Sequence, residues 1–181
     1  MKIGVRLAGE GGQGLILAGM ILAEAAAVEE GKNTVMTQSY GPESRGGASK
    51  AEVIISDSDI DYPKVQNPDV LLVMSQEAYD KYSPDLREGG ILLYDSSSVK
   101  ALNPKPSVKC VGVPLTELAK KEVGRALVAN IVALGSLNEL SSLVSHEALT
   151  KAVLGRVPRG TEEMNLKALE VGRRAVGHCG K

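Results

Sequence analysis

Along the first forty positions, each apolar segment has the length of a single strand or helix, and polar or glycine residues separate these segments. Residues 3–8 form a short apolar run, which predicts a buried strand. Residues 12–30 are rich in Ala, Leu, Ile and Gly, which predicts a helix closed by Gly31. Residues 32–38 read as a second strand. A strand, a turn, a helix and a strand in this order predict a β-turn-α-β unit, the opening of a doubly wound sheet.

The same alternation continues to the end of the chain. Further strands are predicted over residues 51–56, 69–74, 91–94 and 107–113. Helices are predicted from Ser75 onward and over residues 115–123, 126–144, 147–154 and 162–176. The fold class is therefore α/β: a Rossmann-like, doubly wound, mostly parallel sheet with helices on both faces and a helical C-terminal part. We expect one domain over residues 1–181.

Composition excludes several classes of function. The net charge of the 181 residues is −1, and the chain contains neither Phe nor Trp. A nucleic-acid-binding protein usually carries a basic surplus and aromatic stacking residues, so we expect no nucleic-acid partner. No apolar run reaches membrane length, and the N-terminus begins directly with a strand-like segment. We therefore expect a cytoplasmic protein that does not contact a membrane.

The Cys and His residues do not form a metal-binding pattern. Cys110 and Cys179 are far apart, and His146 and His178 do not complete a set by spacing. Structural zinc sites and iron–sulfur clusters usually need four ligands. His178 and Cys179 offer two at most, and we interpret that segment as a frayed C-terminus. We expect no metal or cluster on this chain.

The segment GEGGQG at residues 9–14 is the first candidate site. Glycines at this spacing let the chain turn tightly after a strand and bring backbone N–H groups close to a phosphate at a helix N-terminus. A dinucleotide site would also need an acidic residue at the end of the second strand, and residues 37–40 read TQSY instead. The turn therefore fits an anion in general. A turn that only packs helix against strand is the alternative.

A second glycine-rich loop, GPESRGG at residues 41–47, carries a single arginine, Arg45. Loops that follow parallel strands lie at the carboxyl edge of the sheet, where ligands bind. Arg45 would then face the same crevice as the glycine turn, and a guanidinium pairs well with phosphate or carboxylate. Together the two loops favour an anionic ligand or a partner subunit docked at this edge.

Several segments occur in an order that resembles the gamma subunits of the 2-oxoacid:ferredoxin oxidoreductases. They are GEGGQGLILAGMILAEAA, SYGPESRGGASKAEVIISDSDIDYPKV, DVLLVMSQEAYDKY, LREGGILLYD and ANIVALG. The resemblance covers most of the chain, and SYGPESRGG is most similar to the 2-oxoglutarate branch. It implies a multi-subunit enzyme that cleaves a 2-oxoacid oxidatively with coenzyme A, giving acyl-CoA, carbon dioxide and reduced ferredoxin.

The resemblance also implies how the cofactors and the catalytic residues are divided among the subunits. Thiamine diphosphate and iron–sulfur clusters would belong to partner subunits, namely alpha, beta and, as a further candidate, delta. This chain would hold no catalytic residue and would help to bind coenzyme A. Carried over to this sequence, the coenzyme A contacts are Gly9, Gly11, Gly12, Gln13, Gly14, Ser44 and Arg45. In some members of the resembled family, this domain is fused to the other subunits in one chain. Those members have more lysine in the second loop, whereas this chain has Glu43 and a single Arg45.

Two other functions stay open at this point. A stand-alone NAD(P)-dependent oxidoreductase would use the glycine turn for a dinucleotide, but the acid after the second strand is missing. A scaffold subunit would use the turn for packing only and bind no ligand. A homodimer of the isolated chain, through surfaces meant for its partners, is a further expectation.

Overall fold

The computed structural model describes residues 1–40 and 47–177. Its strands and α-helices are β1 (Lys2–Glu10), α1 (Leu15–Glu24), β2 (Asn33–Ser39), β3 (Ala48–Ser56), β4 (Val70–Val73), α2 (Gln76–Tyr82), β5 (Ile91–Asp95), β6 (Lys109–Val113), α3 (Leu115–Leu118), α4 (Ala129–Ser141), α5 (His146–Arg156) and α6 (Glu162–Gly177). Short π- or 3₁₀-helical turns occupy Ala25–Glu29, Ser83–Asp85, Ala119–Val123 and Ala126–Val128. The predicted order of strands and helices is confirmed.

The strands of the described residues form one sheet in the order β2-β3-β1-β4-β5-β6. Strands β1, β4, β5 and β6 pair in parallel, whereas β3 is antiparallel to both of its neighbours, β1 and β2. Five strands therefore run in one direction and β3 runs in the other. The predicted α/β class with a mostly parallel sheet is confirmed.

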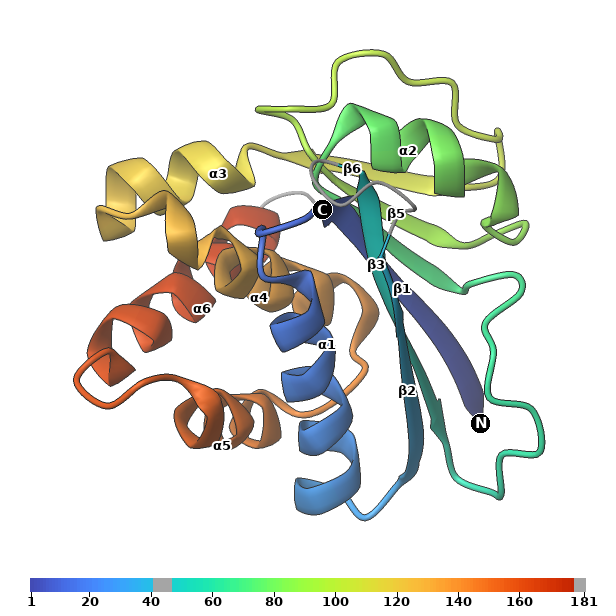
Figure 1. The fold of residues 1–181 in the computed structure, drawn as a ribbon, viewed down its shortest axis with the longest axis horizontal. Coiled ribbons are helices and arrows are strands. Elements are labelled where there is room, and N and C mark those ends of the chain that lie inside the picture. The colour runs from blue at the N-terminus through green and yellow to red at the C-terminus, as the bar shows by residue number, and fades with distance from the viewer. Residues whose placement is uncertain (41–46, 178–181) are drawn as a thin grey trace.

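Helices cover both faces of this sheet, as Figure 1 shows. Because successive side chains of a strand point to opposite faces, strands such as β1, β3 and β4 contribute to two clusters of buried residues. The larger cluster joins alternate strand residues such as Leu7, Val53 and Leu72 to helices α1 and α3–α6. The smaller cluster joins Ala8 and Leu71 to α2 and the strands β5 and β6. The first strand and helix of the predicted β-turn-α-β unit, β1 and α1, thus pack against each other in the larger cluster.

The sheet differs from a simple doubly wound sheet at its β2 edge. Strands β1 and β2 run in the same direction on either side of α1, but β3 lies between them. Only residues 40–47 connect β2 to β3, and a parallel crossover needs a dozen residues or more. The chain therefore returns as an antiparallel strand, and β3 extends from Ala48 rather than from the predicted residue 51.

Two helices begin and end at other residues than the sequence predicts. The predicted helix over residues 12–30 begins only at Leu15, after the left-handed Gly14, and ends as a π-helical turn. The predicted helix over residues 126–144 begins as a 3₁₀ turn and ends at Ser141, before the left-handed Ser142 with φ 49°. A left-handed residue thus precedes the first helix and follows the second.

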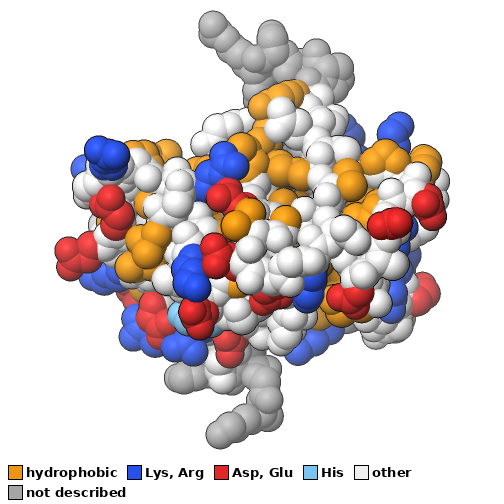
Figure 2. All heavy atoms as spheres, turned by 90° about the horizontal axis from the view of Figure 1, so that it is seen from below, with side chains coloured by type: hydrophobic (Ala, Val, Ile, Leu, Met, Phe, Trp, Pro, Cys, Tyr) orange, Lys and Arg blue, Asp and Glu red, His pale blue; other side chains and the backbone are white. Residues whose placement is uncertain are grey.

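Charged side chains of both signs are interspersed on the face of the molecule shown in Figure 2. Neither sign forms a continuous block on that face. This distribution agrees with the net charge of −1. In the described part of the chain, no helix is long and apolar enough to cross a membrane.

Helices α4 and α6 approach each other closely through two glycines. A Cβ atom on Gly135 would lie 2.2 Å from the carbonyl oxygen of Leu169, and one on Gly172 would lie 1.9 Å from that of Val132. The Ser136 hydroxyl donates to the Gly172 carbonyl at 2.8 Å. These small residues of α4 and α6 therefore belong to the core.

We expect Gly172→Ala to lower the free energy of unfolding by about 1–3 kcal/mol, because the added methyl group forces α4 and α6 apart. Gly155→Ala is the matched control on α5. There a Cβ atom would meet, among the described residues, only the Glu24 carboxylate at 3.9 Å. This control should gain up to about 1 kcal/mol from helix propensity. Chemical denaturation of both purified variants checks the prediction, and equal stabilities would contradict it.

Candidate functional site

The glycine turn lies at the carboxyl end of β1, where the chain reverses into α1. Two of its glycines face protein atoms at short range. A Cβ atom on Gly9 would lie 2.2 Å from the Gln13 amide oxygen and 2.8 Å from the Leu15 side chain. Gly14 is the N-cap of α1 with φ 76°, a backbone conformation that favours glycine. A side chain at Gly9 would displace the Gln13 and Leu15 side chains, and the backbone conformation at Gly14 favours glycine. Structure alone thus gives a reason for glycine at both positions.

The Gln13 side chain holds the turn in place. Its amide oxygen accepts the Glu10 backbone N–H at 2.7 Å, and its amide nitrogen donates to the Met74 carbonyl at 3.1 Å. Met74 follows β4, the strand next to β1. Gln13 thus links the turn to the end of the neighbouring strand. Any role of Gln13 in ligand binding stays a prediction.

The other two glycines face outward. Around the Cβ positions of Gly11 and Gly12, no atom of the described residues lies within 4 Å, and both residues are exposed. The first hydrogen bond of α1 runs from the Ala18 N–H to the Gly14 carbonyl. The N–H groups before Ala18 therefore have no helical acceptor, and the α1 N-terminus carries partial positive charge. The turn offers backbone donors to an incoming anion.

A hollow of about 280 Å³ lies directly beside the turn. Its described lining residues are all uncharged: Gly12, Gln13, Met74, Thr116, Ala126, Leu127 and Ala129. Leu127 at its rim is 74% exposed, which is unusual for a leucine. The hollow thus adds an apolar surface to the polar backbone groups of the turn.

The end of β2 lies at the same edge of the sheet as the turn. Through β3, the last residue of β1, Glu10, pairs with Ala48, and the last residue of β2, Ser39, pairs with Lys50. The prediction that the two loops share one edge is therefore confirmed for their ends. Ser44 and Arg45 lie outside the described residues, so their part in the site stays a prediction.

Two polar residues at the ends of neighbouring strands, Ser75 and Asp95, have structural roles. Ser75 caps α2, because its hydroxyl accepts the Ala78 N–H at 3.1 Å, as predicted. Asp95 is fully buried, and its carboxylate accepts the Thr116 hydroxyl at 2.5 Å, so it ties β5 to α3.

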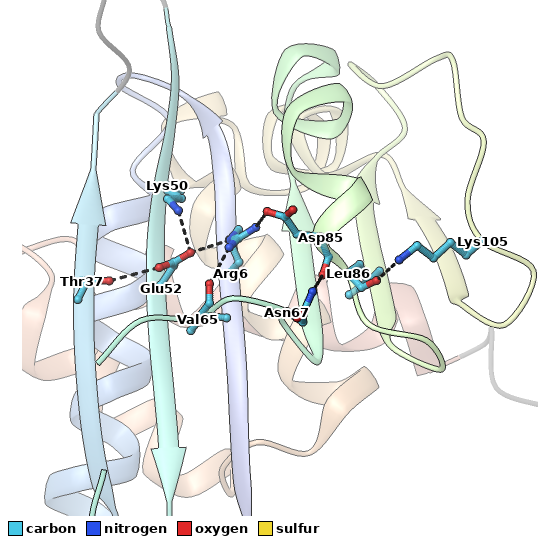
Figure 3. A network of polar contacts seen from close by, with 9 residues as sticks. All are labelled: Arg6, Thr37, Lys50, Glu52, Val65, Asn67, Asp85, Leu86 and Lys105. Carbon is cyan, nitrogen blue, oxygen red and sulfur yellow. Dashed lines mark hydrogen bonds and ion pairs between the residues drawn. The ribbon is translucent and has the colours of Figure 1, made fainter. Parts of the chain in front are cut away.

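One charged cluster escaped the sequence analysis, and Figure 3 shows it. Arg6 on β1 is 2% exposed and donates to the Glu52 carboxylate at 2.8 Å and to the Asp85 carboxylate at 2.6 Å. It also donates to the Val65 carbonyl at 2.8 Å, in the connection between β3 and β4. Lys50 contacts Glu52 at 2.9 Å. A lone arginine inside an apolar run was the only signal in the sequence.

This cluster is a structural element of the fold. Its acceptors come from a strand, a helix-end turn and a connection, and it lies on the α2 face of the sheet (Figure 3). The arginine therefore fixes the connection 57–69 across that face. A buried ion pair with full hydrogen bonding holds these segments in one arrangement.

The described residues offer little acid–base or metal chemistry. No group of three His, Cys, Asp or Glu side chains within residues 1–40 and 47–177 could hold a metal ion. Burial raises the pKa of the Cys110 thiol. The pKa of Tyr94 is also raised, mainly by burial and in smaller part by the charge of Cys110. A thiol with a raised pKa is a poor nucleophile at neutral pH, so Cys110 is not a catalytic candidate.

Comparisons with known proteins agree with this geometry. The family model for pyruvate ferredoxin/flavodoxin oxidoreductase matches residues 4–175. The 2-oxoglutarate synthase subunit KorC of Methanocaldococcus jannaschii is 52% identical over 95% of this chain and 92% of that protein. A crystal structure of a keto/oxoacid ferredoxin oxidoreductase gamma subunit from Geobacter sulfurreducens has a TM-score of 0.92 and 50% identity, covering 100% of this chain and 99% of that one.

A more distant relative is a much longer chain. The structure of 2-oxoglutarate:ferredoxin oxidoreductase from Magnetococcus marinus, with 2-oxoglutarate, coenzyme A and succinyl-CoA bound, has a TM-score of 0.87 at 25% identity. It covers 98% of this chain, which corresponds to 31% of that one. The fold described above therefore occurs both as a separate subunit and as part of a larger chain.

This chain belongs to the pyruvate ferredoxin/flavodoxin oxidoreductase family. The resemblance to the gamma subunits of 2-oxoacid:ferredoxin oxidoreductases, found in the sequence, is confirmed. The 2-oxoglutarate branch that SYGPESRGG favoured is also the branch of the KorC relatives.

We expect Arg6→Met to lower the free energy of unfolding by about 3–5 kcal/mol, because it leaves the buried Glu52 carboxylate without its arginine. Arg174→Met is the control. The Arg174 side chain is 61% exposed and pairs with Glu170 on the surface of α6. Its loss should change the free energy of unfolding by less than about 0.5 kcal/mol. Thermal and denaturant unfolding measure the stability of both variants. A loss for Arg6→Met as small as the loss for Arg174→Met would show that the cluster is dispensable.

Proposed function

We propose that this chain acts as the gamma subunit of a multi-subunit 2-oxoglutarate:ferredoxin oxidoreductase and that its glycine turn holds the phosphate end of coenzyme A. The observation that carries this proposal is the turn at residues 9–14. It is open to solvent at Gly11 and Gly12, and it ends at the N-terminus of a ten-residue helix. The family resemblance found in the sequence implies the reaction, the oxidative cleavage of a 2-oxoacid with coenzyme A to acyl-CoA and carbon dioxide. The related structure from Magnetococcus marinus holds 2-oxoglutarate, coenzyme A and succinyl-CoA.

The chemistry of the turn suits a phosphate. Backbone N–H groups at a helix N-terminus bind anions without any cationic side chain, and the helix dipole adds to this attraction. The hollow beside the turn has an apolar lining, which suits the uncharged parts of a large cofactor. Coenzyme A combines phosphates with such parts, so one ligand fits both surfaces.

Arg45 is proposed as the cationic partner of the turn. Ala48 pairs directly with Glu10 at the start of the turn. Two residues, Gly46 and Gly47, separate Arg45 from Ala48 in the sequence. The three trans peptide units between the two Cα atoms span at most about 11 Å. The guanidinium is long enough to add to that reach, so it can supply the positive charge that the lining of the hollow lacks. Ser44 beside it would add a hydroxyl donor.

The geometry favours coenzyme A over a dinucleotide. In dinucleotide-binding folds the second strand lies next to the first, and an acidic residue at its end holds the ribose. Here β3 separates β1 from β2, which displaces the end of β2 from the turn by two strand spacings, about 10 Å. The end of β2 also carries Thr37 and Gln38 in place of an acid. Both differences count against an NAD(P) site.

The remaining chemistry is proposed for partner subunits. This chain corresponds to 31% of the Magnetococcus marinus chain, so most of such an enzyme lies outside it. Alpha, beta and, as a further candidate, delta subunits would carry thiamine diphosphate and the iron–sulfur clusters, and ferredoxin would be reached through that complex. The chain would contribute by positioning coenzyme A, which can raise a rate without supplying an acid, a base or a nucleophile. A cytoplasmic location and a homodimer of the isolated chain stay predictions.

We expect Gly11→Glu to raise the KM for coenzyme A at least about tenfold in the assembled enzyme, since its carboxylate would repel the phosphates at the turn. Gly11→Gln is the matched control, because it adds nearly the same volume without the charge. The Cβ position at Gly11 is open, so neither variant should disturb folding. Steady-state kinetics with coenzyme A as the varied substrate measure the difference. Identical KM values for the two variants would favour the scaffold function.

We expect Arg45→Ala to raise the KM for coenzyme A about tenfold and to leave electron transfer from a preformed reaction intermediate unchanged. The reason is that Arg45 would bind the cofactor and take no part in the redox step. Single-turnover reduction of ferredoxin, with and without coenzyme A, separates the two effects. A coenzyme A dependence equal to that of the wild-type enzyme would remove Arg45 from the site.

A further inference from the structure

Asn130 is a buried polar side chain that joins the first turns of two helices. It lies near the start of α4 and is 5% exposed. Its amide oxygen accepts the Ile131 N–H at 2.9 Å, within the first turn of α4. Its amide nitrogen donates to the Gly14 carbonyl at 3.0 Å, at the start of α1 and 116 residues away in the sequence. The orientation of the amide group is therefore fixed from both ends.

We propose that Asn130 is a positioning residue for coenzyme A, which fixes the direction of the first peptide unit of α1 so that its N–H group faces the bound phosphate. This inference rests on the proposed function of the glycine turn. Asn130 acts through the backbone of Gly14 and makes no contact of its own with the cofactor.

The geometry of a trans peptide carries the argument. The C=O of Gly14 and the N–H of Leu15 belong to one planar unit and point in opposite directions. The Gly14 carbonyl accepts hydrogen bonds from both the Ala18 N–H, at 3.1 Å, and the Asn130 amide, at 3.0 Å. Because these two donors hold the carbonyl inside the protein, they turn the Leu15 N–H toward the open end of the helix. That is the end where the turn would meet an anion.

The fit between Asn130 and Gly14 is close. A Cβ atom on Gly14 would lie 2.5 Å from the Asn130 amide nitrogen, so only a residue without a side chain leaves room for this hydrogen bond. Asn130 is also one residue after Ala129, which lines the hollow beside the turn. Asn130 therefore holds the turn and one wall of the hollow in a fixed relation.

A second asparagine on the same helix gives a matched control. Asn138 is 8% exposed, accepts the Val144 N–H at 3.1 Å and donates to the Val144 carbonyl at 2.9 Å. It thus has the same pattern of one donor and one acceptor contact to the backbone. It ties the end of α4 to the following loop and lies away from the glycine turn in sequence and in hydrogen bonding. A purely structural loss at either asparagine should have similar consequences.

The test compares Asn130→Asp with Asn138→Asp in the assembled enzyme. Each aspartate keeps the shape and the acceptor, removes the amide donor and adds a negative charge. The uncharged pair Asn130→Ser and Asn138→Ser is therefore measured beside it. We expect Asn130→Asp to raise the KM for coenzyme A about tenfold, while kcat and the KM for 2-oxoglutarate stay within twofold of wild type. Asn138→Asp should leave all three parameters within twofold. The melting temperature of each enzyme is recorded, because a structural role alone would lower both melting temperatures without a selective change in KM.

Asn130→Ser and Asn138→Ser separate the loss of the donor from the added charge, since serine also removes the amide donor but adds no charge. We expect Asn130→Ser to raise the KM for coenzyme A as well, and a rise with Asn130→Asp alone would overturn the positioning role. Equal KM values for the two variants of a pair would overturn the positioning role. If Gly11→Glu raises the KM for coenzyme A and Asn130→Asp does not, the inference fails and the proposed function stands. If neither variant changes it, the proposed function fails as well. A rise with Asn130→Asp but none with Gly11→Glu would also overturn the inference, since the effect would not pass through the turn.

Discussion

The arrangement of this subunit depends on the space available where β1 ends and α1 begins. At Gly9 the backbone passes against Gln13 and Leu15, and at Gly14 it passes against Asn130. Side chains at these two positions would push α1 away from the sheet or from α4. Their absence lets the helix start within five residues of the strand, with its N-terminus at the carboxyl edge. Packing therefore accounts for Gly9 and Gly14, and the φ of 90° accounts for Gly12. Gly11 is the glycine of the turn that neither packing nor backbone conformation explains.

The antiparallel strand β3 brings the second loop to this edge. Because the connection from β2 is short, β3 inserts beside β1 and its first residue, Ala48, pairs with Glu10. This insertion also places Glu52 next to Arg6, where the buried ion pair ties the two strands to the connection that follows β3 (Figure 3). The departure from a simple doubly wound sheet thus separates the turn from β2 and places Ala48, the first residue of β3, next to the turn.

Local patterns in the sequence were sufficient for most elements of the fold. The apolar runs, the Ser75 cap and the glycine spacing each act within a few residues, so the sequence predicts the order of strands and helices and the position of the turn. The order of the strands within the sheet could not be predicted in the same way. It depends on pairings such as Arg6 with Glu52, which lie 46 residues apart. Asn130 is a similar case, because nothing near it in the sequence indicates that its partner is Gly14. Ser44 and Arg45 stay predictions from the sequence pattern and the family resemblance.

The central claim is that the glycine turn recognises the phosphates of coenzyme A. Calorimetric titration of the assembled enzyme with coenzyme A and with pantetheine, which lacks the phosphates, tests it most directly. The account predicts that coenzyme A binds at least about tenfold more tightly than pantetheine and that this advantage is lost when the enzyme carries Gly11→Glu. An advantage that persists in full in the Gly11→Glu enzyme would mean that the phosphates bind elsewhere in the complex and would contradict the account.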